Sequence, residues 1–349
     1  MKKTVTKAMG VLLALVIILT AIPCTQAQAA KKSKLSEFSF IHDFSEGLAA
    51  VMKDGTYSFI DKTGKVVMKT NFPEVYDFSE GMAAVRSDDW KWGYINKKGK
   101  VIVKPQYDNA FDFSDGLAKV SKNGKFGFIN KKGKVAIRLT YDFVYDFSEG
   151  LAVVEKGGKR SIIDTTGKTV VDNLAYWGNG VFSEGMSRVW DDNSNCGFIN
   201  KKGETVVKPS YQHAGDFHEG LAAVMKDGKV GFIDKTGKEV IAPQFESDEP
   251  DFLPQFTGGL AAVMKNGRYG YIDKKGKTVI KFQYSAAGSF SEGLAIVYKN
   301  GKCGYINKAG KVVIKLKYTN GGYFRDGLSL VFKGDTPYFI DKTGKIVLK

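Results

Sequence analysis

The stretch Asp216 to Phe245, DFHEGLAAVMKDGKVGFIDKTGKEVIAPQF, decides the fold, because variants of it recur along the chain. Aligned on the glycine of its FSEG-like segment, the sequence contains nine copies, spaced 34 to 39 residues apart. The aligned glycines are Gly47, Gly81, Gly116, Gly150, Gly185, Gly220, Gly259, Gly293 and Gly327. A period of this length is typical of a repeat array, in which one small unit is stacked many times because it cannot bury its own apolar face.

The first part of each copy predicts a strand followed by a tight hairpin. All nine copies keep Phe three residues before the aligned glycine and Val four residues after it, as in Phe217 and Val224. Strict positions that alternate with tolerant ones are typical of a strand with one demanding face. Asp227-Gly228 then predicts a type I′ turn, in which both central residues need a positive φ.

The second part of each copy predicts two more strands. Phe232 and Ile233 are adjacent and therefore point to opposite faces, so we expect the middle strand to be covered on both sides. Asp234-Lys235-Thr236-Gly237 predicts a second hairpin with a type I turn and a left-handed glycine. A third strand follows, and then a short connector that carries an aromatic residue such as Tyr107. The expected unit is a three-stranded antiparallel meander, and the fold class is all-β.

Sheets that need cover on both faces must stack on one another, either in an open β-solenoid (superhelix) or in a propeller-like ring. The sequence begins its repeats with a connector, Phe38 to Phe44, and ends at Lys349 just after a third strand. Joining these ends would complete a unit, as a ring requires, but an open array can start in the same phase. Because nine units are many for a ring, we expect the open superhelix, with the ring as the alternative.

Several motifs at a fixed phase resemble those of the WG-repeat (KWG-repeat) family. They are the FSEGLA segment, an aromatic-Gly-aromatic-Ile core of which Trp92-Gly93 is the literal WG, and the KKGKVIVKPQY segment from Lys97 to Tyr107. The resemblance covers residues 38–349. It implies a β-repeat scaffold and supplies no catalytic residues.

The N-terminal segment differs from everything after it. Lys2, Lys3 and Lys7 precede an apolar run from Ala8 to Ile22, and Ala27-Gln28-Ala29 resembles a cleavage site. We expect residues 1–29 to be a secretory signal peptide, 30–37 a linker and 38–349 the repeat array, in a secreted or surface-associated protein. An uncleaved anchor is the alternative. Pro23 disfavours lipidation of Cys24.

The net charge indicates the kind of partner to expect, and the cysteine spacing indicates the state of the thiols. The formal net charge is +15, and removing the signal peptide with its three lysines leaves +12, which favours anionic partners. Cys196 and Cys303 lie three repeats apart, too far for a disulfide in a regular stack, so we expect buried free thiols.

Residues that could carry chemistry are few. His213 and His218 are too isolated for a metal site, and Asp191 to Asn195 resembles a calcium loop that lacks its glycine. The carboxylates next to the aligned glycines recur in nearly every unit, which argues for a structural role rather than for a glycosidase pair. We expect no catalytic residue, metal, cofactor or nucleic-acid partner, and no enzymatic activity.

The lysines of the second hairpin loops are the leading candidate surface. Because these loops share one end of every meander, stacking would give a basic rim for an anionic cell-envelope polymer or a surface protein. The carboxylates beside the aligned glycines lie at the same end and could neutralise part of the rim. The candidate residues are Lys97, Lys98, Lys100, Lys131, Lys132, Lys134, Lys274, Lys275 and Lys277.

An insertion in the longest interval is a second candidate, since insertions in repeat arrays map to loops and often carry function. It is acidic and holds two apolar residues that we expect to be exposed, although a tolerated insertion explains it as well. The candidate residues of this partner loop are Glu246, Asp248, Glu249, Asp251, Phe252 and Leu253.

A third possibility uses aromatic residues at loop or variable positions. Trp90, Trp177 and Trp190 could stack on sugars in a carbohydrate-recognising or carbohydrate-active protein. Salt separates this hypothesis from polyanion binding, which weakens steeply as salt rises. A purely structural spacer is the remaining alternative.

Overall fold

The structure, a computed structural model, describes residues 34–249 and 252–349. The expected signal peptide, Cys24 and the first residues of the expected linker lie outside them. The 3-10 helix η1 (Lys34–Glu37) opens the described part and buries Leu35, and the remaining regular elements are β-strands. In these residues no helix has the length and apolar character that crossing a membrane requires.

The strands form nine antiparallel sheets, each built from one contiguous segment, which we number as blades 1 to 9. Blade 1 comprises β1 (Phe40–Ile41), β2 (Leu48–Lys53), β3 (Thr56–Asp61) and β4 (Val66–Lys69); blade 2, β5 (Glu74–Val75), β6 (Met82–Arg86), β7 (Trp92–Asn96) and β8 (Val101–Tyr107); blade 3, β9 (Asn109–Ser114), β10 (Leu117–Lys122), β11 (Lys125–Asn130) and β12 (Val135–Tyr141). Blade 4 comprises β13 (Phe143–Val144), β14 (Leu151–Lys156), β15 (Lys159–Asp164) and β16 (Thr169–Val171); blade 5, β17 (Trp177–Ser183), β18 (Met186–Trp190), β19 (Cys196–Asn200) and β20 (Thr205–Tyr211); blade 6, β21 (His213–Ala214), β22 (Leu221–Lys226), β23 (Lys229–Asp234) and β24 (Glu239–Phe245). Blade 7 comprises β25 (Leu260–Lys265), β26 (Arg268–Asp273) and β27 (Thr278–Tyr284); blade 8, β28 (Ala286–Ala287), β29 (Leu294–Lys299), β30 (Lys302–Asn307) and β31 (Val312–Tyr318); blade 9, β32 (Asn320–Gly321), β33 (Leu328–Lys333), β34 (Thr336–Asp341) and β35 (Ile346–Leu348).

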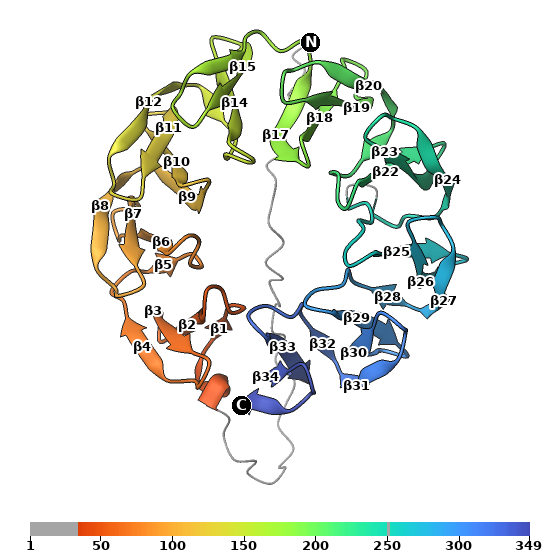
Figure 1. Cartoon of the computed structure of the whole chain (residues 1–349). Coiled ribbons are helices and arrows are strands. Elements are labelled where there is room, and N and C mark those ends of the chain that lie inside the picture. Colours follow the sequence, from red (N-terminus) through yellow and green to blue (C-terminus); the bar gives the residue numbers. More distant parts are fainter. Residues whose placement is uncertain (1–33, 250–251) are drawn as a thin grey trace, which may run out of the picture. The chain divides into compact units, whose positions relative to one another are not determined.

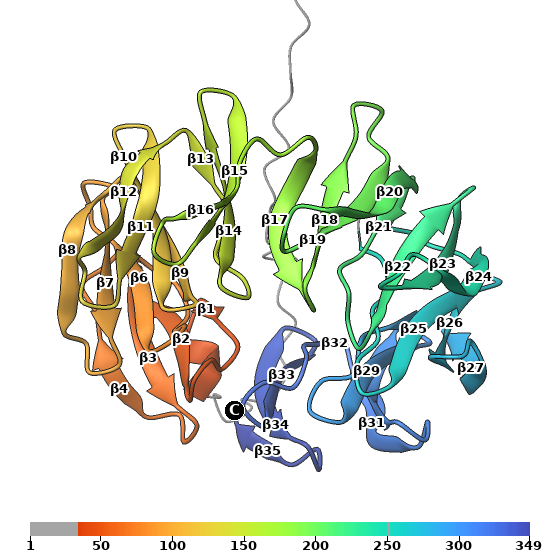
Figure 2. The same ribbon diagram turned by 45° about the horizontal axis from the view of Figure 1, so that its top comes forward.

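The blades form a ring, so the expectation of an open superhelix is wrong and the propeller-like alternative is correct (Figure 1). Successive blades stand side by side around the ring, and blade 9 returns to blade 1 (Figure 2). The first strand of each four-stranded blade lies nearest the centre and the last lies at the outside. Each sheet is complete within its own segment, so the ring closes by packing and not by exchanging a strand between the two ends.

Two-sided burial explains the ring. In β3, Phe59 packs in the cluster shared with blade 2, while its neighbour Ile60 packs in the cluster shared with blade 9. Nine such clusters join the nine pairs of neighbouring blades, and their members are almost fully buried. An open array would leave one apolar face uncovered at each end, and burial of apolar surface therefore favours closure.

The closing interface repeats the contacts of the others. An aromatic residue of the third strand of one blade meets the FSEG phenylalanine of the next, as in Phe59 and Phe78, whose ring centroids are 4.9 Å apart. Phe339 of blade 9 and Phe44 of blade 1 make the equivalent contact at 4.8 Å. Blade 1 thus follows blade 9 as an ordinary neighbour.

The expected three-stranded unit needs correction, because eight of the nine described sheets have four strands. The residues just before the FSEG segment, expected as connector, form an inner strand that is often only two residues long. His213 and Ala214, for example, pair with Met225 and Val224. A strand this short has no alternation to recognise in the sequence. Blade 7, where the insertion lies, has three strands.

Both predicted turns are confirmed. In the first hairpin of blade 6, Asp227 and Gly228 have φ values of 50° and 71°, as a type I′ turn requires. In the second, the Gly237 N–H donates to the Asp234 carbonyl at 2.9 Å, with Gly237 at a φ of 84°. The segment from Asp191 is a longer first hairpin, as expected, in which the Asn193 and Asn195 N–H groups donate to the Asp191 carboxylate.

Both cysteines of the described part are buried free thiols, which confirms the prediction. Burial raises the pKa of the Cys196 thiol to about 11 and raises that of Cys303 as well. Cys196 packs in the core cluster between blades 5 and 6 and Cys303 in that between blades 8 and 9, where the neutral thiol is favoured.

Candidate functional site

The FSEG end of the ring is tied together by a repeated contact. In each case the acidic residue before the aligned glycine accepts a hydrogen bond from the N–H of the next blade's aligned glycine, as Glu46 does from Gly81 at 3.0 Å. Asp326 of blade 9 closes the series by accepting from Gly47 at 2.6 Å. We call these residues the junction carboxylates. They are Glu46, Glu80, Asp115, Glu149, Glu184, Glu219, Glu292 and Asp326.

The leading lysine candidates divide into two groups. Lys97, Lys131 and Lys274 form ion pairs with Glu46, Glu80 and Glu219 at 2.9, 2.9 and 3.2 Å. The junction carboxylates therefore neutralise part of the basic rim, which is the alternative stated in the sequence analysis. The side chains of the second group are exposed at the same end of the ring; they are Lys98, Lys100, Lys132, Lys134, Lys275 and Lys277.

The pairing fixes the ionised state of the junction carboxylates. Partial burial of Glu219 raises its pKa, but hydrogen bonds from Lys274 and from the Gly259 N–H outweigh this effect and lower it overall. The pKa values of Glu46, Glu149 and Glu184 are lowered by the same balance of causes. These four carboxylates are therefore held in the ionised form in which they join neighbouring blades.

The junction between blades 7 and 8 departs from the series. Gly258 replaces the acidic residue, and a Cβ at this position would lie 2.4 Å from the Lys308 Nζ. The hydroxyl of Thr257, which replaces the FSEG serine, is buried without a hydrogen-bond partner. The lysine of the series is therefore retained here although the carboxylate is missing.

Four carboxylates, Asp43, Asp77, Asp112 and Asp146, lie in or closely follow the inner strands of blades 1 to 4, and neighbouring members of this set interact by charge. Asp77 lies 2.8 Å from His42, and Asp146 lies 3.3 Å from Lys119. Although Asp112 is exposed on the inner wall, desolvation by the surrounding protein and the charges of Asp77 and Asp146 raise its pKa to about 6.

The candidate partner loop is more tightly held than the sequence suggests. Glu246 accepts from the Gly267 N–H at 2.9 Å, and Asp248 accepts from the Tyr269 hydroxyl at 2.7 Å. Leu253, expected to be exposed, packs against the core cluster of blades 6 and 7. Phe252 is 69% exposed, Glu249 is exposed, and Asp251 lies outside the described residues. Of the two apolar residues expected to be exposed, only Phe252 is exposed.

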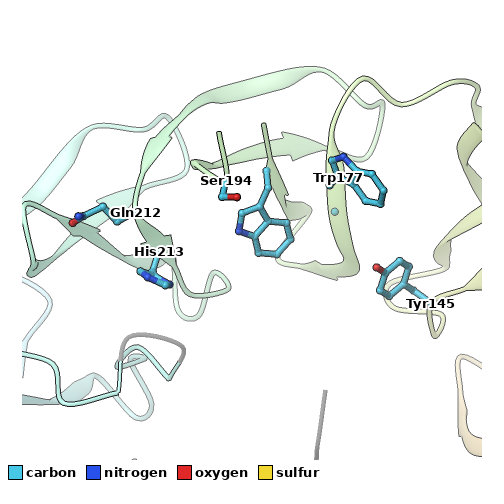
Figure 3. Close-up of a pocket in the computed structure, with 7 residues that line it drawn as sticks. Tyr145, Trp177, Ser194, Gln212 and His213 are labelled. Carbon is cyan, nitrogen blue, oxygen red and sulfur yellow. The ribbon is translucent and has the colours of Figure 1, made fainter. Parts of the chain in front are cut away.

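A concave site lies at blades 4 to 6 (Figure 3). It is an open depression with a volume of about 580 Å³. Trp190 and Ser194 belong to the β18–β19 hairpin, at the end of these strands away from the FSEG turn and its junction carboxylate. The hairpins that join β14 to β15 and β18 to β19 project from this end (Figure 2). The lining residues are Tyr145, Trp177, Gly178, Trp190, Ser194, Gln212 and His213.

The extended inner strand of blade 5 creates this depression. In β17, Trp177 pairs across the sheet with Trp190 of β18, so the two indoles stand on neighbouring strands, and the register shifts between Gly178 and Phe182. Gly180 has a φ of 69°, and a Cβ there would lie 2.4 Å from Tyr145. Only glycine lets the backbone approach Tyr145 this closely.

Two arginines support the indoles. The Arg160 guanidinium lies 3.1 Å from the centroid of Trp177 and is paired with Glu155 at 3.2 Å. The guanidinium of Arg188 lies 5.7 Å from the Trp190 ring and is paired with Asp216 at 2.7 Å. These stacks hold the indoles, and Trp177 remains 58% exposed. Both cations are already matched by carboxylates.

Polar groups surround the aromatic surface. Ser194 supplies a hydroxyl, and Gln212 uses its Oε1 to accept from the Gly228 N–H at 2.9 Å, which leaves its NH₂ group as a donor. Tyr145 adds a phenol whose pKa is raised by burial. Among the described residues, no group of three or more His, Cys, Asp or Glu could hold a metal ion.

Sequence reasoning identified part of this site. Trp177 and Trp190 were candidates, and the structure brings them together, whereas Trp90 lies apart in the first hairpin of blade 2. Tyr145 and Gln212 were missed. The available signal was the segment Trp177-Gly178-Asn179-Gly180, which replaces the usual connector.

The family model described as "WG containing repeat" matches the chain at residues 36–57, 57–89, 92–126, 126–159, 197–229, 231–269, 269–303 and 304–336. The matched ranges leave out 160–196, which holds both depression tryptophans. No curated protein matches the sequence.

Several solved structures match the chain at low sequence identity. A eukaryotic initiation factor is 11% identical, with a TM-score of 0.52, covering 87% of this chain and 90% of that one. The computationally designed Ika8 protein is 12% identical, with a TM-score of 0.44, covering 78% and 93%. BamB from Moraxella catarrhalis is 12% identical, with a TM-score of 0.44, covering 78% and 94%.

Proposed function

This chain belongs to the family of WG-containing repeats, and we propose that it is an exported, non-catalytic scaffold that binds a neutral carbohydrate at blades 4 to 6. The observation that carries the proposal is that Trp177 and Trp190, which are paired on neighbouring strands, both line one open depression. Large exposed aromatic surfaces in a concave site are typical of ligand recognition.

The chemistry of the depression suits a sugar ring. A pyranose has an apolar C–H face that can lie on an indole and a rim of hydroxyls that need hydrogen-bond partners. Ser194, Gln212 and Tyr145 supply donors and acceptors beside the two indoles. Stiff aromatic side chains also lose little conformational freedom on binding, which favours affinity.

The charges favour a neutral ligand over a polyanion. Arg160 and Arg188 are paired with Glu155 and Asp216, so they have little attraction left for an anionic sugar. At the other end of the ring, the first lysine of many second hairpins is paired with a junction carboxylate, which weakens the case for the basic rim. Binding of an anionic polymer therefore becomes the second candidate, supported by the exposed lysines that remain.

A non-catalytic role is supported by the lining of the depression. Glycoside hydrolysis uses two carboxyl groups that flank the bond to be cleaved. None of the residues that line the described depression is Asp or Glu. We propose binding without turnover, and the signal-like N-terminal segment supports export to a location where polysaccharides are accessible.

Titration calorimetry with cellotetraose, chitotetraose, maltotetraose and laminaritetraose tests the proposal. We expect binding of at least one tetrasaccharide, unchanged between low and high salt. Trp177→Ala should weaken binding at the depression about 30-fold, since truncating an aromatic anchor costs ~2 kcal/mol.

Phe252→Ala is the matched control, because Phe252 is a similarly exposed aromatic outside the depression. This variant should bind as the unmodified protein does. If no tetrasaccharide binds, or if Trp177→Ala binds with the affinity and the stoichiometry of the unmodified protein, the depression is not a carbohydrate site.

A further inference from the structure

Blade 2 carries a second exposed aromatic group on the same end of the ring. Trp90 lies in the hairpin between β6 and β7 and is 71% exposed. The Arg86 guanidinium lies 3.9 Å from its ring, and Arg86 is paired with Glu74 at 2.6 Å. Tyr76 lies within range of the charges of Glu74 and Arg86, and its ring centroid is 4.8 Å from that of the buried Trp92.

This group repeats the set of side chains found around Trp177. Each combines an exposed tryptophan, an arginine stacked on the indole, a glutamate paired with that arginine and a tyrosine. Tyr76 and Tyr145 even occupy the same repeat position, in Val-Tyr-Asp-Phe-Ser-Glu-Gly. The charges of Glu74 and Arg86 act on Tyr76 as those of Glu155 and Arg160 act on Tyr145. The tryptophans, in contrast, come from different strands and loops, so a copied repeat does not explain the match.

The backbone at Trp90 also departs from the usual pattern. Trp90 has a φ of 61°, and Ser194 at the equivalent place in blade 5 has a φ of 64°. At this equivalent place most other first hairpins have Gly, such as Gly228 and Gly267. A bulky residue in this region costs on the order of 1 kcal/mol, and such strain tends to persist at binding sites. The strained residue here is the one that displays the indole.

We infer that blade 2 holds a second carbohydrate subsite, formed by Trp90 and Tyr76 with the Arg86–Glu74 pair. This inference rests on the proposed function and assigns the same ligand class, a neutral sugar. Because both sites lie on one end of the ring, one polysaccharide chain or two strands of a polymer could engage both. Two linked sites give an avidity above either affinity.

Stoichiometry and paired variants test the inference, with the tetrasaccharide panel as probe. Trp90→Asn removes the indole but keeps a residue that tolerates positive φ. We expect about two tetrasaccharides per unmodified protein, about one in Trp90→Asn or Trp177→Ala, and none in the double variant. The avidity on the corresponding insoluble polysaccharide should fall about 100-fold or more in each single variant. Phe252→Ala should change neither quantity.

The outcomes separate the two proposals. One tetrasaccharide per protein, lost in Trp177→Ala and unaffected by Trp90→Asn, would overturn the second subsite while leaving the first intact. Binding lost only in Trp90→Asn would overturn the proposed function at blades 4 to 6 and leave blade 2 as the site. The absence of binding to every tetrasaccharide would overturn both.

Discussion

The two ends of the ring differ in whether their polar and aromatic side chains recur from blade to blade. At the FSEG end, the same glutamate or aspartate recurs from blade to blade and is bonded to the next blade's glycine N–H. At the hairpin end, blades 2 and 5 carry tryptophans and longer turns that the other copies lack. Repetition marks the contacts that hold the blades together, and departures from it mark the surface with the features of a binding site.

The same contrast holds for charge. The repetition of Lys97, Lys131 and Lys274 makes them candidates for binding a polyanion. Each is, however, paired with a carboxylate of the previous blade. Exposed ion pairs contribute little stability individually, yet the backbone hydrogen bond to the same carboxylate adds a charge-assisted contact at each junction. Mutations at the FSEG end should therefore change the stability of the protein, and mutations at the hairpin end should change ligand binding.

The closing junction should show the largest stability effect. Asp326→Asn removes the charge that accepts from the Gly47 N–H at 2.6 Å, while asparagine tolerates the φ of 54°. We expect the free energy of unfolding to fall by about 1.5 kcal/mol, as for other charged hydrogen bonds. Urea denaturation measures it, with Asp335→Asn in an exposed hairpin of the same blade as control. Equal stability of both variants would mean that closure does not depend on this contact.

The pH dependence of a regular junction should come next. The pKa of Glu219 is lowered in the folded state, so its contribution is complete above the ordinary value of 4.5 and lost as the pH falls through the folded value. Glu219→Gln should cost about 1 kcal/mol at pH 7. At pH 3 the protein and the variant should unfold at nearly the same urea concentration. A difference that persists undiminished at pH 3 would contradict an ionic role for Glu219.

Completing the irregular junction should stabilise the ring. Gly258→Glu places a carboxylate where the other junctions have one, and the end of the Lys308 side chain can move aside to pair with it. The φ of 62° is close to the 52° at which Glu46 sits. We expect a gain of about 0.5 kcal/mol. Gly267→Glu, at a φ of 66° in a hairpin, should instead destabilise the protein, and a loss in both variants would contradict the junction account.

The smallest effect should come from the inner wall. The folded state raises the pKa of Asp112 to about 6, so ionisation opposes folding above pH 6 and has no such effect below the ordinary value of 3.8. Asp112→Asn should raise the melting temperature by about 1 °C at pH 7, and the gain should vanish near pH 4. Differential scanning calorimetry measures both. A gain at pH 4 as large as that at pH 7 would show that charge is not its cause.

Local features of the fold were predictable, and its closure was not. Asp227-Gly228 and the Phe232-Ile233 pair correctly indicate the type I′ hairpin and a strand buried on both faces. Closure depends on small angles between blades and on contacts such as Phe44 with Phe339. These residues occupy ordinary repeat positions, so nothing in the sequence distinguishes a closing interface from an internal one.

The candidate site was predictable in its residue types but not in its assembly. Trp177 and Trp190 stand out as aromatic residues at variable positions, but their pairing depends on the extension of β17 to seven residues. Tyr145 reaches the site from the preceding blade and Gln212 from the following one. Contacts between blades cannot be read from a single repeat.

Retention on insoluble polysaccharide compares the two ends of the ring most directly. The protein, a Trp177→Ala variant and a Lys98→Gln, Lys132→Gln, Lys275→Gln variant would be passed over the polysaccharide that corresponds to the preferred tetrasaccharide, from low to high salt. We predict that the lysine variant is retained like the unmodified protein at every salt concentration and that Trp177→Ala is released. Retention that disappears with salt and with the lysines, but not with Trp177, would contradict the account and return the binding surface to the basic rim.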